Sequence, residues 1–199
     1  MKTVRAFVGV PLGEEVVRAA AQLSSSLRAR LAAQGVSPKW VLPGNMHVTV
    51  RFLGNVDEAQ MPAVKETLGP VVARHASFFA VFRGIGCFPD AQRPSVLWAG
   101  LADRGEPMDR LAADVNKALD GLAFPREDRP FHAHLTLARM RRGAPPPDLA
   151  ALVEEHAAFE LGSTVVREVV LFESSLRPRG PVYEAIWRGP LNPGGRREG

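Results

Sequence analysis

The sequence contains one cysteine, Cys87, and lacks the apolar segments that would place it in or across a membrane. A single cysteine excludes an intramolecular disulfide and any zinc or iron–sulfur site built from several cysteines. No apolar run approaches the ~18 residues that a membrane-spanning helix needs. The segment MKTVRAFVGV is interrupted by Arg5 and lacks the long apolar stretch of a secretion signal. We therefore expect a soluble, cytoplasmic protein with no membrane partner.

Two common catalytic motifs are also absent from the sequence. There is no GxxxxGK[ST] phosphate loop, so the chain carries no P-loop for ATP. There is no GxSxG motif, so a serine hydrolase is not indicated. With 199 residues, 46% of them hydrophobic and 23% charged, the chain should fold as one domain or as a pair of small lobes.

Lysine is scarce among the basic residues, because 21 of the 25 are arginine. The net charge is +4 at pH 7. The planar guanidinium group forms paired hydrogen bonds to phosphate oxygens, so this balance suits a phosphate-bearing partner. Arginine-rich usage can equally reflect the composition of the genome, and both interpretations stay open at this point.

Apolar periodicity predicts an α+β chain in two similar halves, each mixing helices with antiparallel strands. The expected strands are residues 4–10, 39–42, 46–54, 77–86, 95–101, 131–139, 159–161, 166–174 and 182–188. The expected helices are residues 14–34, 57–74, 107–122 and 148–157. We expect a single bilobal domain over residues 1–191, followed by a flexible tail at 192–199 that has no periodicity.

The segments HVTVRFLG (47–54) and HLTLAR (134–139) repeat the pattern of histidine, any residue, threonine and an apolar residue. On a strand, side chains two residues apart share a face. His47 and Thr49 therefore project together, and so do His134 and Thr136. A single copy of this pattern is typical of a partly buried histidine, whereas a second copy at the corresponding place in the other half indicates a function.

An arginine follows each motif histidine, and the two spacings differ, so a regular strand would place the two arginines on different faces. Arg51 lies on the same strand face as His47 if the strand is regular. Arg139, five positions after His134, has the wrong parity and would reach the same site only past the strand end or through a bulge.

Two histidines on opposite sides of a phosphorus atom can act as general base and general acid. The unperturbed pKa of histidine, about 6.5, lets its side chain take up and release protons near neutral pH. A threonine two residues away offers a hydroxyl to a phosphoryl oxygen, and an arginine can neutralise the charge that develops there. This chemistry requires no metal ion and no cofactor.

HVTVRFLG and RPFHAHLTLAR resemble the two His-x-Thr-x signatures of the 2H phosphoesterase superfamily, and most closely its RNA 2′,3′-cyclic phosphodiesterases, also called 2′-5′ RNA ligases. AFVGVPL, GIGCFP, RPSVLWAGL and LFESSLRPRGPVYEAI extend the resemblance over about residues 3 to 191. It implies a two-lobed α+β fold, with two similar antiparallel sheets flanked by helices around a central cleft.

The resemblance also implies a role for six residues. His47 and Thr49 would form one catalytic pair, and His134 and Thr136 the other. Arg139 matches an arginine that contacts phosphate, and Phe52 matches an aromatic residue that packs on the terminal nucleoside.

The expected reaction is hydrolysis of a 2′,3′-cyclic phosphate, on RNA 3′ ends or nucleotides, to a 2′-phosphomonoester by a monomer. His47 would be the proton donor and His134 the proton acceptor, an assignment that comes from the resemblance alone. Attack by a 5′-hydroxyl instead of water would give ATP-independent 2′-5′ joining of RNA.

Two other classes of function stay open at the level of sequence. His47, His132 and His134 could form a three-histidine zinc site in a zinc-dependent phosphoesterase. Alternatively, the basic balance and the aromatic residues could serve a non-catalytic module that binds RNA ends. Such a module has no need for two matched proton-transfer histidines.

Overall fold

A single sheet of nine strands and four α-helices make up the described part of the computed structural model, which covers residues 2–102, 106–122, 124, 129–141, 147–178 and 180–194. The predicted α+β class is confirmed. The helices are α1 (Glu14–Ala33), α2 (Met61–Ala73), α3 (Glu106–Asp120) and α4 (Ala150–Glu155), and two short 3₁₀ helices are η1 (Pro43–Asn45) and η2 (Glu58–Gln60).

All strand pairs among the described residues are antiparallel, in the order β7-β4-β5-β6-β3-β1-β8-β9, with β2 paired to β6. Their bounds are β1 (Thr3–Pro11), β2 (Lys39–Trp40), β3 (His47–Asp57), β4 (Phe78–Phe88), β5 (Val96–Leu101), β6 (His134–Arg139), β7 (Glu160–Val166), β8 (Glu168–Arg177) and β9 (Gly180–Pro190).

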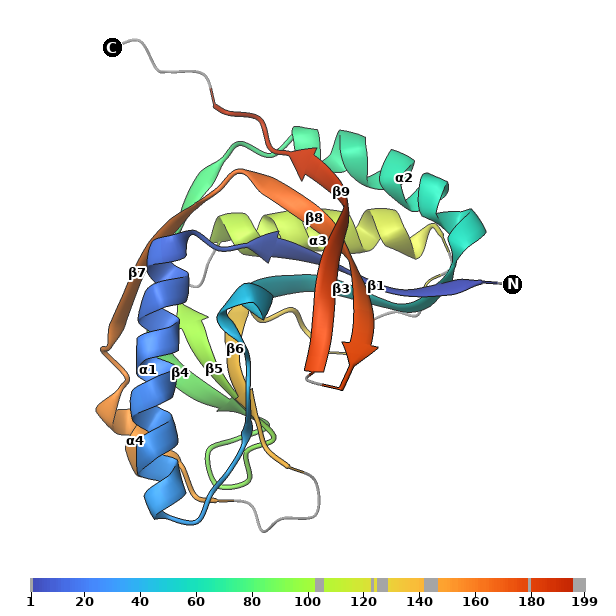
Figure 1. Ribbon diagram of the computed structural model, residues 1–199. Coiled ribbons are helices and arrows are strands. Elements are labelled where there is room, and N and C mark those ends of the chain that lie inside the picture. Colours follow the sequence, from blue (N-terminus) through green and yellow to red (C-terminus); the bar gives the residue numbers. More distant parts are fainter. Residues whose placement is uncertain are drawn as a thin grey trace, which may run out of the picture.

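The sheet consists of two halves that meet at β3 and β6 (Figure 1). One half has the order β7-β4-β5-β6, and the other has β3-β1-β8-β9. A single residue pair, Val48 with Leu135, joins β3 to β6 in the strand register. The two antiparallel sheets expected from the sequence are therefore present as halves of one curled sheet, and the two histidine motifs lie at the junction.

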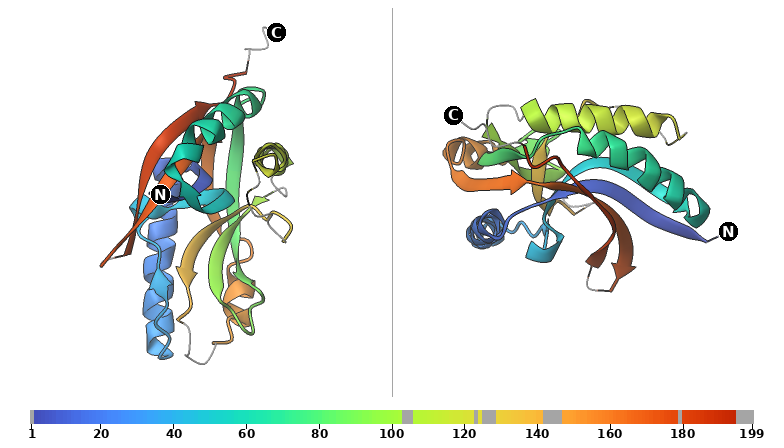
Figure 2. Two further views of the ribbon diagram at one scale, coloured as in Figure 1. Left: turned by 90° about the vertical axis from the view of Figure 1, so that its right-hand side faces the viewer. Right: turned by 90° about the horizontal axis from the view of Figure 1, so that it is seen from above.

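Helices lie on both sides of the curled sheet. Figure 2 shows α2 and α3 together on one side and α1 on the other. α1 packs against β7 and β6 in one half, whereas α3 packs against α2 and β3 in the other. Glu14 and Glu15 in the first turn of α1 and Arg30 in its last turn suit the helix dipole.

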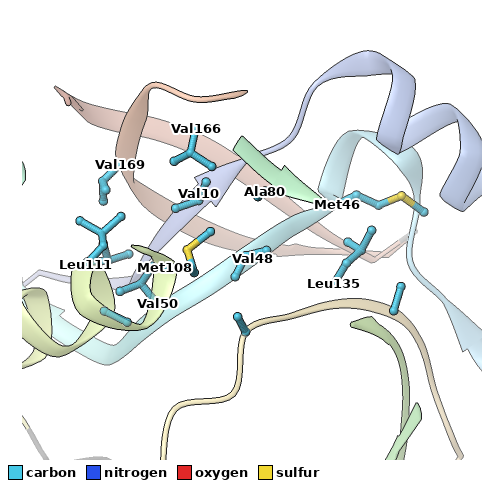
Figure 3. Close-up of a cluster of buried hydrophobic side chains, with 14 of the residues drawn as sticks. Val10, Met46, Val48, Val50, Ala80, Met108, Leu111, Leu135, Val166 and Val169 are labelled. Carbon is cyan, nitrogen blue, oxygen red and sulfur yellow. The ribbon is translucent and has the colours of Figure 1, made fainter. Parts of the chain in front are cut away.

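The core between β3 and α3 supports the strand that carries the first motif. Val48 and Val50 are buried and lie close to Met108 and Leu111 of α3 (Figure 3). Leu135 of β6 is buried near Met46, beside the start of β3. The apolar residues between and after the motif histidines thus fix both strands to the core, which leaves the opposite face for polar side chains.

Several predicted boundaries differ from the structure, among them those of β7 and β6. The strand expected over residues 159–161 runs over Glu160–Val166, because it pairs with β4 along six register positions. Gly162, with φ of +95°, interrupts the alternation that would have revealed its length. The strand expected over 131–139 begins at His134.

The start of the predicted tail is bound to the body of the protein. The backbone N–H of Ser77 donates to the Asn192 carbonyl at 2.7 Å, and the N–H of Asn192 donates to the His75 carbonyl at 2.8 Å. Residues 195–199 of the predicted tail lie outside the described residues.

Candidate active site

The two His-x-Thr motifs lie directly opposite each other on neighbouring antiparallel strands. Val48 of β3 pairs with Leu135 of β6, and both side chains are fully buried. Counting one residue to either side places His47 opposite Thr136 and Thr49 opposite His134. All four are half-buried and project to the face opposite Val48 and Leu135, which we call the histidine face.

Each histidine ring is held by a carbonyl two residues before it. The Nδ1–H of His47 donates to the Asn45 carbonyl at 2.8 Å, and the Nδ1–H of His134 donates to the His132 carbonyl at 2.7 Å. Because a carbonyl only accepts, these bonds assign the ring proton to Nδ1. Nε2 of each neutral ring is then the proton acceptor, and Nε2 of His47 accepts from the Thr49 hydroxyl at 3.0 Å.

Burial keeps both rings neutral in the unliganded protein. It lowers the pKa of His47 to about 4, against the bond to Asn45, and the charge of Arg139 and a proton on His134 would act in the same direction as burial. Burial also lowers the pKa of His134, against the bond to the His132 carbonyl, and the charges of the His132 ring and of Arg139 act in the same direction as burial. Near pH 7 both histidines are therefore able to accept a proton at Nε2.

Aromatic side chains surround the ring of His47. Phe7 of β1 stacks on it at 4.7 Å between ring centroids, and Tyr183 of β9 meets it edge-on at 5.3 Å. Gly9 leaves space for the ring, because a Cβ there would lie 3.3 Å from His47 Cδ2 and 3.1 Å from the Val48 carbonyl oxygen. Packing and the Asn45 bond thus restrict the ring to one orientation.

The ring of His134 has a similar aromatic environment in the other half. Phe88 of β4 lies edge-on to it at 5.0 Å between centroids, and Trp98 of β5 lies at 6.3 Å. His132 packs beside them, with its ring centroid 4.8 Å from that of Trp98, 5.4 Å from Phe88 and 6.2 Å from His134. His132 therefore flanks the site and packs against its aromatic wall.

A bulge in β6 brings Arg139 to the histidine face. The register with β5 steps from Trp98 with Thr136 to Leu97 with Ala138, so Leu137 is an extra residue. Leu137 and Ala138 are both buried, and the alternation after them is reversed. Arg139 could reach the histidine face only past the strand end or through a bulge, and this bulge is present. The charge of Arg139 acts on both motif histidines and on Tyr183.

A corresponding bulge in β3 corrects the expectation for Arg51. The register with β1 skips Val50, and Arg51 consequently turns to the core side with only 2% of its surface exposed. Its guanidinium donates to Asn116 Oδ1 at 2.7 Å and to Asp120 Oδ1 at 3.1 Å, both on α3. Regular alternation, which would place Arg51 beside His47, is therefore wrong beyond Val50.

The same bulge places Phe52 on the histidine face. Phe52 is 49% exposed, and its ring lies 6.1 Å from that of Phe7. An exposed phenylalanine next to a buried aromatic ring offers a flat apolar surface on which a base can stack.

Sequence reasoning did not identify Phe7, Tyr183 or Asn45 as neighbours of His47. Phe7 lies in a predicted strand, but the side of the sheet to which its side chain points cannot be assigned before the partner strand is known. Tyr183 is the only tyrosine in the chain, which is a weak signal for a special environment. Asn45 lies in the predicted turn before the first motif, where asparagine is common for conformational reasons alone.

The described residues contain no group of three or more histidine, cysteine, aspartate or glutamate side chains arranged to hold a metal ion. His47, His132 and His134 thus do not converge as the zinc alternative requires.

None of the helices in the described ranges is both long and apolar enough to cross a membrane.

The family model described as LigT like Phosphoesterase matches residues 10–98 and 101–183, which include both His-x-Thr motifs. The chain belongs to this phosphoesterase family. The RNA 2′,3′-cyclic phosphodiesterase of Archaeoglobus fulgidus is 34% identical over 92% of this chain and 98% of its own length. The protein of the same name from Aeropyrum pernix is 34% identical over 85% of this chain and 96% of its own length.

Solved structures share the fold of this LigT-like phosphoesterase. The protein TT0787 of Thermus thermophilus is 30% identical, with a TM-score of 0.77 over 96% of this chain and 99% of that chain. The apo form of E. coli LigT, 23% identical, has a TM-score of 0.73 over 96% of this chain and 99% of that chain. At that identity the E. coli structure supports the fold alone.

Proposed function

We propose that this LigT-like phosphoesterase hydrolyses the 2′,3′-cyclic phosphate of an RNA 3′ end, or of a nucleotide, to a 2′-phosphomonoester. The observation that carries the proposal is the opposed register of the two motifs, which presents two imidazole rings and two threonine hydroxyls on one face. The relatives named RNA 2′,3′-cyclic phosphodiesterase, which match over most of the chain, supply the substrate class.

In the proposed reaction, His134 accepts a proton on one side of the phosphorus and His47 donates a proton on the other. Nε2 of His134 takes a proton from a water molecule as its oxygen bonds to phosphorus. The bond from phosphorus to O3′ breaks, and O3′ receives a proton from Nε2 of His47. The product carries the phosphate on O2′ and a free 3′-hydroxyl, so atoms and protons balance.

His47 has to be protonated before it can donate, although its pKa in the unliganded protein is lowered to about 4. A bound phosphodiester brings a negative charge next to the ring. An opposite charge favours the protonated imidazole, so substrate binding raises the pKa of His47. We therefore propose that His47 takes up this proton when the substrate binds.

The remaining residues of the histidine face stabilise the charge on the phosphoryl oxygens and hold the nucleoside. The hydroxyls of Thr49 and Thr136 donate hydrogen bonds to these oxygens, and the guanidinium of Arg139 neutralises their charge. Phe52 provides the stacking surface for the terminal base. Attack by a 5′-hydroxyl in place of water would give a 2′-5′ linkage without ATP, because the same P–O3′ bond breaks.

The decisive experiment is incubation of the purified, chelator-treated protein with adenosine 2′,3′-cyclic phosphate, with separation of the 2′- and 3′-phosphate products. We expect adenosine 2′-phosphate. Formation of the 3′-phosphate would refute the assignment of O3′ as the leaving group. Loss of turnover after chelator treatment, restored by stoichiometric zinc, would refute metal-independent catalysis.

A further inference from the structure

Asn45 makes two hydrogen bonds that link separate parts of the molecule. Its backbone carbonyl accepts from Nδ1 of His47 at 2.8 Å. Its side-chain Nδ2 donates to the Pro181 carbonyl of β9, also at 2.8 Å and 136 residues away in the sequence. Asn45 thus connects the ring of a motif histidine to the strand pair β8–β9.

The segment that carries Asn45 is short and partly exposed. η1 is three residues long, its Pro43 and Gly44 are exposed, and a Cβ on Gly44 would meet nothing within 4 Å. η1 packs against both α1 and β9. In the right-hand view of Figure 2, the connected end of the β8–β9 pair lies away from α2 and α3. The Asn45 amide is therefore a specific attachment for a short surface segment.

β9 reaches His47 a second time through Tyr183. Tyr183 lies two residues after Pro181 on the same strand, and its ring meets the His47 ring edge-on, with an angle of 87° between the planes. The bond to Pro181 and this ring contact hold His47 from the same strand. A shift of β9 would consequently move both restraints together.

The corresponding residue in the other half is fixed differently. His132 precedes its motif histidine by two residues, as Asn45 does, and its carbonyl likewise accepts from Nδ1 at 2.7 Å. Its side chain packs on the rings of Trp98 and Phe88. In each half, the residue two positions before the motif histidine has a carbonyl that binds Nδ1 and a side chain that is fixed in place. Among the described residues, only Asn45 of this pair is fixed by a side-chain amide bond.

The position of this carbonyl decides which ring nitrogen of His47 exchanges protons. With Nδ1–H bound to a carbonyl, Nε2 is left facing Thr49 and the substrate. Loss of tautomer control at a catalytic histidine lowers turnover by up to about 10⁴-fold in the serine protease triad. A displaced but still present carbonyl should cost less, on the order of 10- to 100-fold.

We propose that Asn45 is a positioning residue for His47, and that its amide bond to the Pro181 carbonyl fixes the carbonyl that selects the Nδ1–H tautomer. This inference rests on the proposed role of His47 in proton transfer. It assigns Asn45 no contact with the substrate.

The test compares Asn45→Ala and Asn45→Asp with wild-type protein. Asn45→Asp keeps the shape of the side chain but offers Pro181 no N–H donor. The measurements are kcat and KM for adenosine 2′,3′-cyclic phosphate, and ¹⁵N chemical shifts of the histidine rings at pH 8, where both motif histidines are neutral. Asn55→Ala, an exposed asparagine on the same strand as His47, is the matched control.

We expect both Asn45 variants to lose roughly 10- to 100-fold in kcat with a small change in KM. His47 should pass from one tautomer to a mixture, while His134 and the Asn55→Ala protein stay unchanged. An unaltered His47 tautomer in Asn45→Ala would overturn the inference, whatever happens to kcat. Absence of turnover in wild-type protein would refute the proposed function instead, and the ¹⁵N comparison would still test the tautomer.

Discussion

Phe52 and Arg139 occupy equivalent positions in the two halves of the sheet. Each lies five residues after the histidine of its motif (52 − 47 = 5 and 139 − 134 = 5), and each follows a bulge that reverses the strand alternation. Phe52 offers a stacking surface, and Arg139 supplies a positive charge. The near-symmetric scaffold thus places different chemistry at matching sites, which suits the proposed substrate with its one base and one phosphate.

Replacement of Arg139 should show how much its positive charge contributes to turnover. We expect Arg139→Ala to lower kcat/KM for a 2′,3′-cyclic nucleotide by about 10²- to 10³-fold, because one preorganised donor to a charged transition state is removed. Arg139→Lys should recover part of the loss. The control is Arg141→Ala, since Arg141 is exposed and donates its Nε–H to the Ser37 carbonyl.

The same variant has an independent signature in the histidine titrations. The charge of Arg139 lowers the pKa of His47 and of His134, so Arg139→Ala should raise both. Titration of the imidazole protons by NMR measures this directly. Unchanged histidine pKa values together with wild-type kcat/KM would show that Arg139 does not face the site.

Arg51 should contribute to stability, because its guanidinium is buried and bound to α3. Arg51→Met removes a guanidinium that donates to Asp120 and to the Asn116 side-chain carbonyl oxygen. Since Asp120 is partly exposed, we expect a loss in the free energy of unfolding near the lower end of the range typical of broken buried pairs, about 3 kcal/mol. Urea denaturation provides the measurement.

The matched control for Arg51 is Arg110→Met on α3, the helix that Arg51 contacts. Arg110 is largely exposed and its i,i+4 pair with Glu106 is long, at 3.8 Å, so its removal should change stability little. Equal midpoints for the Arg51→Met and wild-type proteins would mean that the buried pair does not stabilise the fold.

Much of the fold could be predicted from the sequence because local patterns determine it. Alternation of apolar residues placed His47 and Thr49 on one face and Val48 on the other, and repetition of the pattern in the second half indicated a shared site. The bulge at Val50 could not be seen, since it lies in the pairing of β3 with β1, and the Asn116 side chain that Arg51 then meets is 65 residues away. Alternation alone therefore assigned Arg51 to the wrong face.

Contacts between distant strands are the other part of the site that the sequence did not reveal. Tyr183 reaches His47 only because β9 pairs with β8 and β8 with β1. The bond from Asn45 to Pro181 depends on the same pairing. Such contacts follow from the strand order, which local periodicity does not determine.

Removal of either motif histidine should nearly abolish turnover. We expect His47→Ala and His134→Ala each to lower kcat by about 10²- to 10⁴-fold, the range for loss of a general acid or base. The double variant should lose less than the product of the two single losses, because the two residues act as a unit. His156→Ala is the control, as this ring bonds to the Leu152 carbonyl at the end of α4. Near-normal turnover in both single variants would refute two-histidine catalysis.

The lowered pKa of His47 also predicts how stability depends on pH. In the unfolded chain the ring titrates near 6.5, whereas burial lowers its pKa to about 4 in the folded protein. Between these values the unfolded state binds more protons, so this contribution to stability is present above about pH 6.5 and is lost as the pH falls towards 4. His47→Gln has no such group. Urea unfolding at intervals from about pH 7.5 to 4 should show the wild-type protein losing stability relative to His47→Gln. A difference in unfolding free energy that stays constant over this range would show that the His47 ring titrates normally in the folded protein and is not held neutral by burial.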